Sequence, residues 1–324
     1  MNEGGGSARK QITELLIVMP KFSIVITTYN RLRLLEQAVA SALAQTYPCE
    51  VVVADDSSTD GTEEYIRSLG DRVIYHRNGV NSGHCVTMNA GVAVAQGDWI
   101  KPLDDDDYLA PNCIEEMVKA ISQYPQTVIC SCQAIQVEQN GTEVSCSPAV
   151  GKVPIFSVLQ EDIHYGMLLE QLPFGTPVQV AFAKDAFLKS GGWDTTFEIN
   201  YDDIDSWVKI AQYGDAVFVN QALAYRTLWP EASHLKFSLQ QRLEKNISIK
   251  NKIYPLVHKK HHNNIPRLQD IHAFLSLYWG LIGLKQRQIG EGLTMMFPAV
   301  FSPSAWQMLS RVISSRKANI NEKS

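Results

Sequence analysis

Four consecutive carboxylates, Asp104 to Asp107, follow a largely apolar run at residues 99–103 of this 324-residue chain. Neighbouring like charges repel one another, so a fold that keeps them together gains from a bound cation. If the backbone stays extended, Asp104 and Asp106 point to one face, and Asp105 and Asp107 point to the other. Carboxylates, phosphate oxygens and water are the usual surroundings of Mg²⁺ or Mn²⁺. The run therefore predicts a metal-diphosphate site, and the alternative is a solvated acidic turn.

A second group of carboxylates follows the Gly-Gly-Trp sequence at residues 191–193. Asp202, Asp203 and Asp205 stand where a helical pattern of apolar residues begins, and this pattern ends before Gly214. As capping groups at a helix N-terminus, carboxylates contribute about 0.3–1 kcal/mol each. An ionised carboxylate beside a hydroxyl is also what a general base requires. One acid is enough for capping, so three acids in four positions favour a function.

Alternating strand and helix patterns must position these two groups. Short β-branched or apolar runs predict strands at residues 22–26, 51–54, 73–75 and 99–103. Helical patterns follow the first three strands, from residue 32 onward, at 62–69 and at 85–95. This alternation predicts a parallel sheet with helices on both faces. Ligands of such sheets bind at the carboxyl ends of the strands, so we expect one crevice where three loops converge, at residues 27–31, 55–59 and 104–107.

The second half of the chain is patterned less regularly. It predicts a helix at 111–124, a strand at 127–136, a hairpin turn at Asn140-Gly141, a mostly helical segment at 153–171 and a strand at 178–183. The last part predicts a basic amphipathic helix at 235–254, a linker at 255–266, and a helical hairpin built from 268–284 and 288–300.

Composition limits the function classes. No GxGxxG follows the first predicted strand and no GxxxxGK[ST] occurs, which disfavours a dinucleotide dehydrogenase and a P-loop NTPase.

The charge of the chain is divided unevenly: from Leu235 onward there are 14 Lys and Arg against 4 Asp and Glu, a charge of +10, whereas the preceding part carries −15. No nucleic-acid-binding motif accompanies this basic part, so membrane phospholipid or a lipid-linked diphosphate is favoured as its partner over nucleic acid, and a solvated basic face is the alternative. The six cysteines form no CxxC, which is typical of reduced thiols in a cytoplasmic protein.

Several motifs together resemble the family 2 inverting glycosyltransferases with the GT-A fold. In chain order, they are Thr27-Thr28-Tyr29-Asn30-Arg31, Asp55-Asp56-Ser57-Ser58-Thr59-Asp60, Asn81-Ser82-Gly83 continuing to Asn89-Ala90-Gly91, Leu103 to Asp107, Gly191-Gly192-Trp193-Asp194, and Asp202-Asp203-Ile204-Asp205. The resemblance implies an α/β fold with a Rossmann-like, mostly parallel nucleotide-sugar-binding sheet, helices on both faces and a small helical C-terminal extension.

Roles carried over from the family are expectations for individual residues. Asp203 would be the catalytic base, and Asp104 and Asp106 would hold Mn²⁺ or Mg²⁺. The residues expected to bind the nucleotide-sugar are Thr27, Tyr29, Arg31, Asp56, Asn81, Asn89, Asp104 and Asp105. The residues expected on the acceptor side are Gly192, Trp193 and Asp202.

Two positions depart from the family pattern. Met88 stands where many relatives have an arginine before the asparagine of the third motif, so one diphosphate contact is missing or supplied elsewhere. Leu228 stands where many relatives have a histidine three residues after a late tyrosine, here Tyr225. His234 is a candidate replacement, and an ordinary surface histidine is the alternative.

The resemblance implies a non-processive, metal-dependent transferase that moves a sugar from a nucleoside-diphosphate sugar, preferably a UDP-sugar, to a glycan or lipid-linked acceptor in bacterial polysaccharide or surface-glycan biosynthesis. A catalytically silent nucleotide-sugar-binding or scaffold protein of the same fold is the alternative. We expect a flexible leader at 1–20, a GT-A domain at 21–232 with a nucleotide-binding half (21–108) and an acceptor half (109–232), and a basic helical extension at 233–324. This extension either packs on the GT-A domain or docks a cytoplasmic protein peripherally on the inner face of the membrane.

Overall fold

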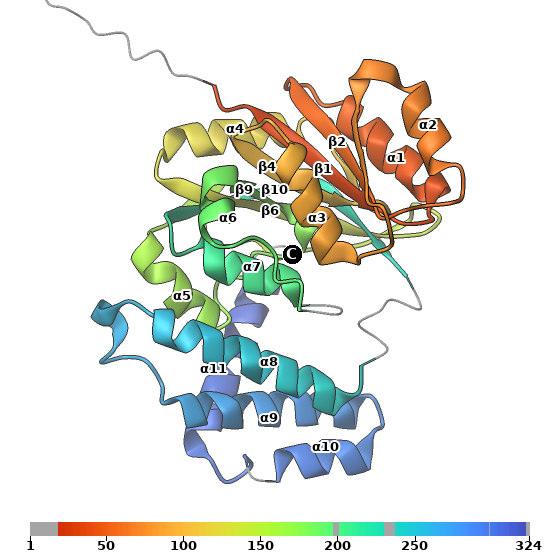
Figure 1. Cartoon of the computed structure of the whole chain (residues 1–324). Coiled ribbons are helices and arrows are strands. Elements are labelled where there is room, and N and C mark those ends of the chain that lie inside the picture. The colour runs from red at the N-terminus through yellow and green to blue at the C-terminus, as the bar shows by residue number, and fades with distance from the viewer. Residues whose placement is uncertain (1–18, 197–200, 230–236, 298, 322–324) are drawn as a thin grey trace, which may run out of the picture.

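A computed structural model describes residues 19–196, 201–229, 237–297 and 299–321. An α/β domain built on one large sheet carries a layer of C-terminal helices on one side (Figure 1). Most of the predicted leader, residues 1–18, lies outside the described residues, as does the segment 230–236 that contains His234.

The first half of the domain follows the predicted alternation. The strands β1 (Phe22–Thr28), β2 (Cys49–Asp55), β3 (Ile74–Arg77) and β4 (Trp99–Asp104) pair in parallel in the order β3-β2-β1-β4. The connecting helices are α1 (Leu32–Leu43), α2 (Thr62–Ser68) and α3 (His84–Val94). Because side chains alternate along a strand, Ile24 of β1 packs with α1 while Val25 packs with α3 on the opposite face. Both faces of the sheet are therefore covered, as predicted.

The second half is a mixed sheet rather than a continued parallel one. The strands β5 (Tyr108–Leu109), β6 (Thr127–Glu138), β9 (Val180–Ala183) and β10 (Asp215–Leu228) extend the order to β4-β9-β6-β10-β5. β9 runs antiparallel to both β4 and β6, whereas β6 and β10 are parallel to each other. The helices α4 (Cys113–Gln123), α6 (Lys184–Lys189) and α7 (Asp202–Ile210) lie between these strands in the chain.

The hairpin prediction is confirmed in this half, whereas the prediction of a mostly helical segment at 153–171 is wrong. The turn at Asn140-Gly141 joins β6 to β7 (Glu143–Cys146) as an antiparallel hairpin. The segment 153–171, predicted to be mostly helical, instead forms β8 (Ile155–Val158) before α5 (Gln160–Leu168). β8 pairs antiparallel with residues 216–219 of β10, a contact between distant segments that no local pattern reveals.

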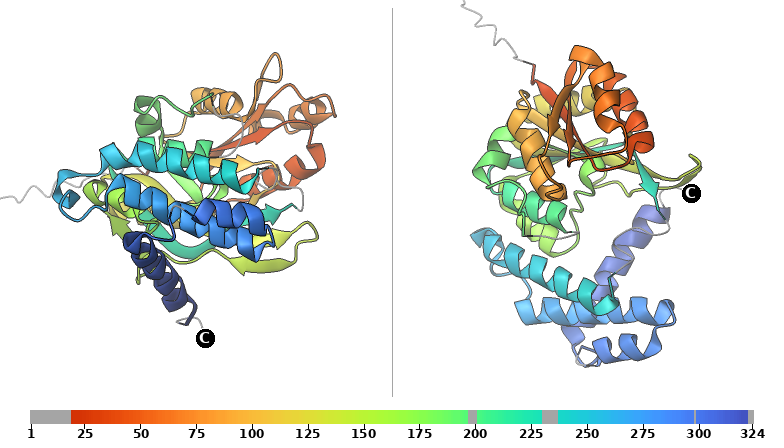
Figure 2. Two further views of the ribbon diagram at one scale, coloured as in Figure 1. Left: turned by 90° about the horizontal axis from the view of Figure 1, so that it is seen from below. Right: turned by 45° about the vertical axis from the view of Figure 1, so that its right-hand side comes forward.

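The C-terminal extension packs firmly on the domain. It consists of α8 (Leu239–Ile253), α9 (Leu268–Lys285), α10 (Ile289–Met296) and α11 (Pro303–Asn321), the last of which the sequence pattern does not predict. α8 contacts α5 and α7, while α9 contacts α8, α10 and α11 (Figures 1 and 2). Lys252 of α8 lies 2.6 Å from the Asp205 carboxylate of α7, and Asp205 is only 1% exposed. In the described part of the chain, no helix combines the length and apolar character that a membrane span needs.

Candidate active site

The carboxylate run forms a turn at the carboxyl end of β4. The Asp107 N–H donates to the Asp104 carbonyl oxygen over 3.2 Å, so the backbone is not extended beyond Asp104 and that expectation is wrong. The turn nevertheless separates the four side chains into two pairs. Asp105 and Asp107 are each 5% exposed, whereas the side chains of Asp104 and Asp106 are 32% and 17% exposed.

The two buried carboxylates, Asp105 and Asp107, accept hydrogen bonds from other groups of the protein. Asp105 accepts hydrogen bonds from the Thr28 hydroxyl at 2.7 Å and from Arg31 Nη1 at 3.2 Å. Asp107 accepts one from the Thr227 N–H of β10 at 2.8 Å. Arg31 Nη1 also lies 3.1 Å from Asp106 Oδ2. The loop after β1, the acidic turn and the end of β10 are thereby tied together.

Burial raises the pKa values of three carboxylates in this turn, because the charged form is less stable away from water. Burial raises the pKa of Asp105 to about 6, although the charge of Arg31 opposes the shift. Burial and the charge of Asp104 raise the pKa of Asp106, and burial with the charges of Asp106 and Asp104 raises that of Asp107 well above its ordinary value. A cation would relieve this repulsion, and the exposed oxygens of Asp104 and Asp106 are hard ligands of the kind that Mn²⁺ or Mg²⁺ accepts. Within the described ranges, no three Asp, Glu, His or Cys side chains form a complete metal cage, so further ligands would have to come from substrate phosphates and water.

His84 links the acidic turn to the second carboxylate group, and sequence reasoning missed it. It is the first residue of α3; its Nε2 lies 3.2 Å from Asp104 Oδ1, and its Nδ1 lies 3.3 Å from Asp202 Oδ2. Its ring meets Trp193 edge-on with centroids 5.0 Å apart. Burial lowers the pKa of His84, but hydrogen bonds and charges of the two carboxylates outweigh it and raise the value to about 10. The sequence feature that could have indicated His84 is its position directly after Gly83, where a helix begins at the edge of the predicted crevice.

Two adjacent carboxylates at the start of α7 have opposite pKa shifts. Burial raises the pKa of Asp203 to about 7, and the charges of Asp202 and Asp104 add to the shift. Burial also acts on Asp202, but the hydrogen bond from His84 prevails and lowers its pKa. The Ile204 N–H donates to Asp203 Oδ1 over 2.7 Å. Tyr201, the residue directly before α7, has a left-handed φ of 68°. Neighbouring acids with separated pKa values are a common feature of acid-base sites.

A side chain of α3, Asn89, holds the Gly-Gly-Trp loop in place. Asn89 donates through Nδ2 to the Trp193 carbonyl oxygen and accepts from the Trp193 N–H, both over 2.9 Å. Gly192 has a φ of +71°, and a Cβ there would lie 2.8 Å from Asn89 Oδ1, so glycine is required. The Trp193 side chain is 1% exposed and packs edge-on against Trp207. In this structure, Asn89 and Trp193 therefore shape the site from within.

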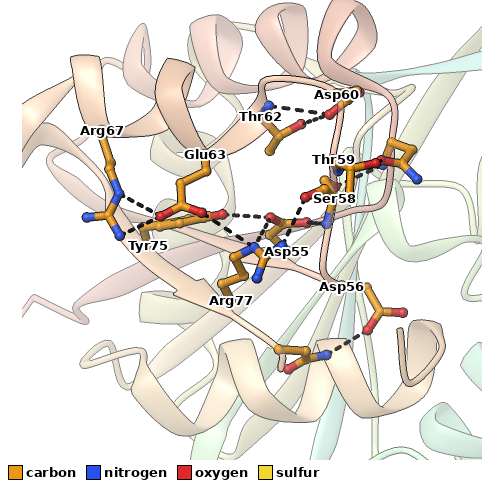
Figure 3. Close-up of polar contacts among 12 residues, drawn as sticks. Asp55, Asp56, Ser58, Thr59, Asp60, Thr62, Glu63, Arg67, Tyr75 and Arg77 are labelled. Atoms are coloured by element: carbon orange, nitrogen blue, oxygen red, sulfur yellow. Dashed lines mark hydrogen bonds and ion pairs between the residues drawn. The ribbon is translucent and has the colours of Figure 1, made fainter. Parts of the chain in front are cut away.

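The loops after β1 and β2 meet as predicted. The Asn30 N–H donates to Ser58 Oγ over 2.9 Å, and the Thr59 N–H donates to Asn30 Oδ1 over 2.8 Å. Figure 3 shows Asp55 among Ser58, Tyr75 and Arg77, with the Tyr75 hydroxyl 2.6 Å from Asp55 Oδ2. These contacts tie the loops after β1 and β2 to each other and to β3.

Asp56 organises the loop that leads to His84. Its carboxylate accepts hydrogen bonds from Asn78 Nδ2 and from the N–H groups of Ser82 and Gly83, each over 2.8 Å. These bonds outweigh burial and lower the pKa of Asp56. Among the other residues expected to bind the nucleotide-sugar, Thr27 is 5% exposed, Tyr29 is 44% exposed, and Asn81 is exposed.

Comparison with known proteins identifies the family. The model of the family described as Glycosyl transferase family 2 matches residues 23–190, just over half of the chain. The chain belongs to this family. It is 29% identical over 209 residues to the uncharacterized glycosyltransferase RP339 of Rickettsia prowazekii, covering 64% of each chain. It is 39% identical over 97 residues to the putative colanic acid biosynthesis glycosyl transferase WcaA of Escherichia coli, covering 29% of this chain and 35% of WcaA. The matches thus span less than two thirds of these relatives.

Solved structures confirm the GT-A fold. TarS of Staphylococcus aureus, crystallised with UDP-GlcNAc, superposes with a TM-score of 0.59 at 16% identity, covering 85% of this chain and 90% of that one. The mannosyltransferase PcManGT of Pyrobaculum calidifontis, in complex with GDP-Man and Mn²⁺, superposes with a TM-score of 0.57 at 18% identity, covering 92% and 81%. The predicted α/β class with a helical C-terminal extension is therefore confirmed.

Proposed function

We propose that this member of family 2 transfers a sugar with inversion from a nucleoside-diphosphate sugar, preferably a UDP-sugar, to a hydroxyl of a glycan or lipid-linked acceptor. The observation that carries the proposal is the His84 bridge. One side chain contacts both Asp104 of the acidic turn and Asp202, the neighbour of Asp203. Groups suited to a donor diphosphate and a group suited to a base thus belong to one site.

The donor half is assigned to residues 21–108. The nucleoside would lie along Thr27, Tyr29 and Asp56, where three loops meet. Arg31, Asn81, Asn89 and Asp105 complete the donor assignment, with the Asn89 side chain acting through the loop that it holds. TarS with UDP-GlcNAc and PcManGT with GDP-Man are named with different nucleotides, so the UDP preference rests on the family resemblance.

The metal is assigned to Asp104 and Asp106, the two more exposed carboxylates of the turn. When bound, Mn²⁺ or Mg²⁺ offsets the negative charge that develops on the departing diphosphate. Arg31, 3.1 Å from Asp106, already supplies part of the positive charge at this place.

Asp203 is assigned as the general base. It takes the proton of the acceptor hydroxyl while that oxygen bonds to the anomeric carbon from the side opposite the diphosphate. The bond between the anomeric carbon and the diphosphate oxygen breaks with its electron pair on the diphosphate, so the configuration inverts. A pKa of about 7 suits a base at neutral pH because an appreciable fraction is ionised.

The acceptor half is assigned to residues 109–232, with Gly192, Trp193 and Asp202 shaping the acceptor side. A relative named GalNAc(5)-diNAcBac-PP-undecaprenol beta-1,3-glucosyltransferase, from Campylobacter jejuni, is 33% identical over 110 residues, which supports a lipid-linked acceptor. The name of WcaA supports a place in polysaccharide biosynthesis. One sugar would be added per encounter.

A donor panel tests this proposal. Binding of UDP-, GDP-, dTDP- and CMP-sugars is measured by calorimetry with and without Mn²⁺, for the wild type and for Asp106→Ala. We expect Mn²⁺-dependent binding of a UDP-sugar that Asp106→Ala loses, whereas Asp71→Ala, in an exposed turn, leaves it unchanged. Absence of Mn²⁺-dependent binding for every donor would refute the proposal. Binding without turnover, even with a mixed lipid and glycan acceptor extract, would favour the silent binding protein.

A further inference from the structure

The two sides of α10 have different surroundings. Its inner side packs on α9, where Gly280 and Gly292 permit close approach: a Cβ on Gly280 would lie 2.8 Å from the Gly292 carbonyl oxygen. Its outer side carries Ile289 and Leu293, which are 60% and 55% exposed, and Phe297 follows with 71% exposed. Residues four apart lie on the same face of a helix, so these three side chains form one apolar stripe.

Exposed apolar side chains continue through the turn after α10, at Val300 and Phe301, and into the start of α11, at Trp306. Phe301 is 77% exposed, Trp306 is 42% exposed and Val300 is 36% exposed. The rings of Phe297 and Phe301 meet edge-on with centroids 6.1 Å apart. We call these six residues the α10 patch: Ile289, Leu293, Phe297, Val300, Phe301 and Trp306. Soluble surfaces seldom gather so many large apolar side chains unless the surface binds something.

Three exposed basic side chains lie close in the chain to residues of the α10 patch. Lys285 and Arg287 are exposed just before α10, and Arg311 is exposed on α11. The whole part from Leu235 onward carries +10, against −15 for the rest of the chain. Phe, Leu and Trp on one helix face with Lys and Arg beside it are the composition of a helix that lies in the interface of an anionic membrane.

The position of α10 favours a lipid surface over a protein groove. α10 lies at the edge of the molecule farthest from the sheet, with its axis along that edge (Figure 1), and α8 and α9 separate it from the α/β domain. A helix presented in this way meets a flat surface without obstruction.

We propose that the α10 patch docks this protein on anionic phospholipid at the inner face of the cytoplasmic membrane. Apolar side chains of the patch enter the headgroup region, while Lys285, Arg287 and Arg311 contact lipid phosphates. On this proposal, α8 packs on the GT-A domain with α9 packed on α8, and α10 with the start of α11 docks on the membrane. The proposal goes beyond glycosyl transfer and does not require a bound donor.

Vesicle co-sedimentation of the full chain tests it without substrate. Wild type is expected to bind vesicles containing phosphatidylglycerol, and to bind pure phosphatidylcholine vesicles at least about tenfold more weakly. The double variant Phe297→Ser with Phe301→Ser should lose at least about tenfold in partitioning, since two exposed rings no longer enter the lipid. Lys285→Gln with Arg287→Gln should weaken binding to anionic vesicles only, and added salt should reproduce this loss.

Matched controls distinguish binding by the α10 patch from nonspecific binding by any exposed apolar side chain. Leu188→Ser and Val144→Ser remove apolar side chains that are 57% and 53% exposed on other parts of the molecule, and they should bind like wild type. Thermal melting verifies that each variant folds. Equal binding of wild type and the phenylalanine double variant would overturn the proposal. So would a wild-type dimer that this double variant converts to monomer without vesicles, because the patch would then bind a second copy of the chain.

Discussion

The pKa of Asp203 leads to a specific pH dependence of transfer. Because burial raises this pKa to about 7, the base is half ionised at pH 7 and only about one tenth ionised at pH 6. Activity that requires the ionised form should therefore rise about tenfold between pH 6 and pH 8 and level off above that. The assay is the initial rate of donor consumption at subsaturating donor and constant Mn²⁺ concentration.

Removing the neighbouring charge tests the cause of the shift. Asp202→Asn deletes the largest charge effect that raises the pKa of Asp203, so the lower limb of the profile should move toward acid pH. Asp71→Asn, at an exposed position in a turn, serves as the control and should leave the limb in place. A wild-type limb near pH 4, the ordinary range of an aspartate, would refute the reasoning.

Stability gives an independent reading of the same group. The folded-state pKa of Asp203 is raised, so the folded protein binds its proton more tightly than the unfolded chain between about pH 4 and pH 7. This group's contribution to stability is present at low pH and is lost as pH rises through about 7. Asp203→Asn should therefore raise the Tm relative to wild type at pH 8 and leave it nearly unchanged at pH 4. An equal effect at both pH values would contradict the raised pKa.

Three further variants test the surroundings of the site. His84→Ala should weaken Mn²⁺ binding in the presence of UDP about tenfold, measured by calorimetry, because His84 orients Asp104 at 3.2 Å. Asp205→Ala should lower the free energy of unfolding in urea by about 3 kcal/mol, because it leaves Lys209 and Lys252 without the buried carboxylate between them. Gly91→Val should cost about 2 kcal/mol in the same assay, since a Cβ at this position lies 2.5 Å from Val25 Cγ1.

Each of these variants has a control of the same type elsewhere in the chain. His258→Ala removes another histidine without changing the acidic turn, Asp185→Ala removes an exposed carboxylate that pairs with Lys189, and Gly79→Val adds a side chain where nothing lies within 4 Å of a Cβ. Unchanged Mn²⁺ affinity in His84→Ala would remove His84 from the site. If either stability variant loses no more than its control, the packing argument for that position is wrong.

Local pattern predicted the first half of the fold well. Strands, helices and the convergence of three loops follow from periodicity and from the rule that ligands bind at the carboxyl ends of parallel strands. The Asn140-Gly141 hairpin follows from turn chemistry. These features depend on residues close together in the chain, which is why the sequence alone reveals them.

Features that depend on distant pairing were not predictable. β8 forms because residues 155–158 meet β10, and β9 inserts antiparallel between β4 and β6. His84 and Asp202 are 118 positions apart, so nothing local connects them. The acidic turn was predicted as a ligand site, but its backbone was expected to be extended. The hydrogen bond from Asp107 to Asp104 instead closes a turn, and contacts with Thr28, Arg31 and Thr227 decide which carboxylates are buried.

The most direct test of the proposed chemistry compares wild type with Asp203→Asn on one donor. Binding of a UDP-sugar in the presence of Mn²⁺ and the rate of donor consumption are measured on the same preparations. The assignment of Asp203 as base predicts equal binding and a loss of about 10²–10⁴-fold in rate for Asp203→Asn. A rate within threefold of wild type, or a loss of binding as large as the loss of rate, would contradict it.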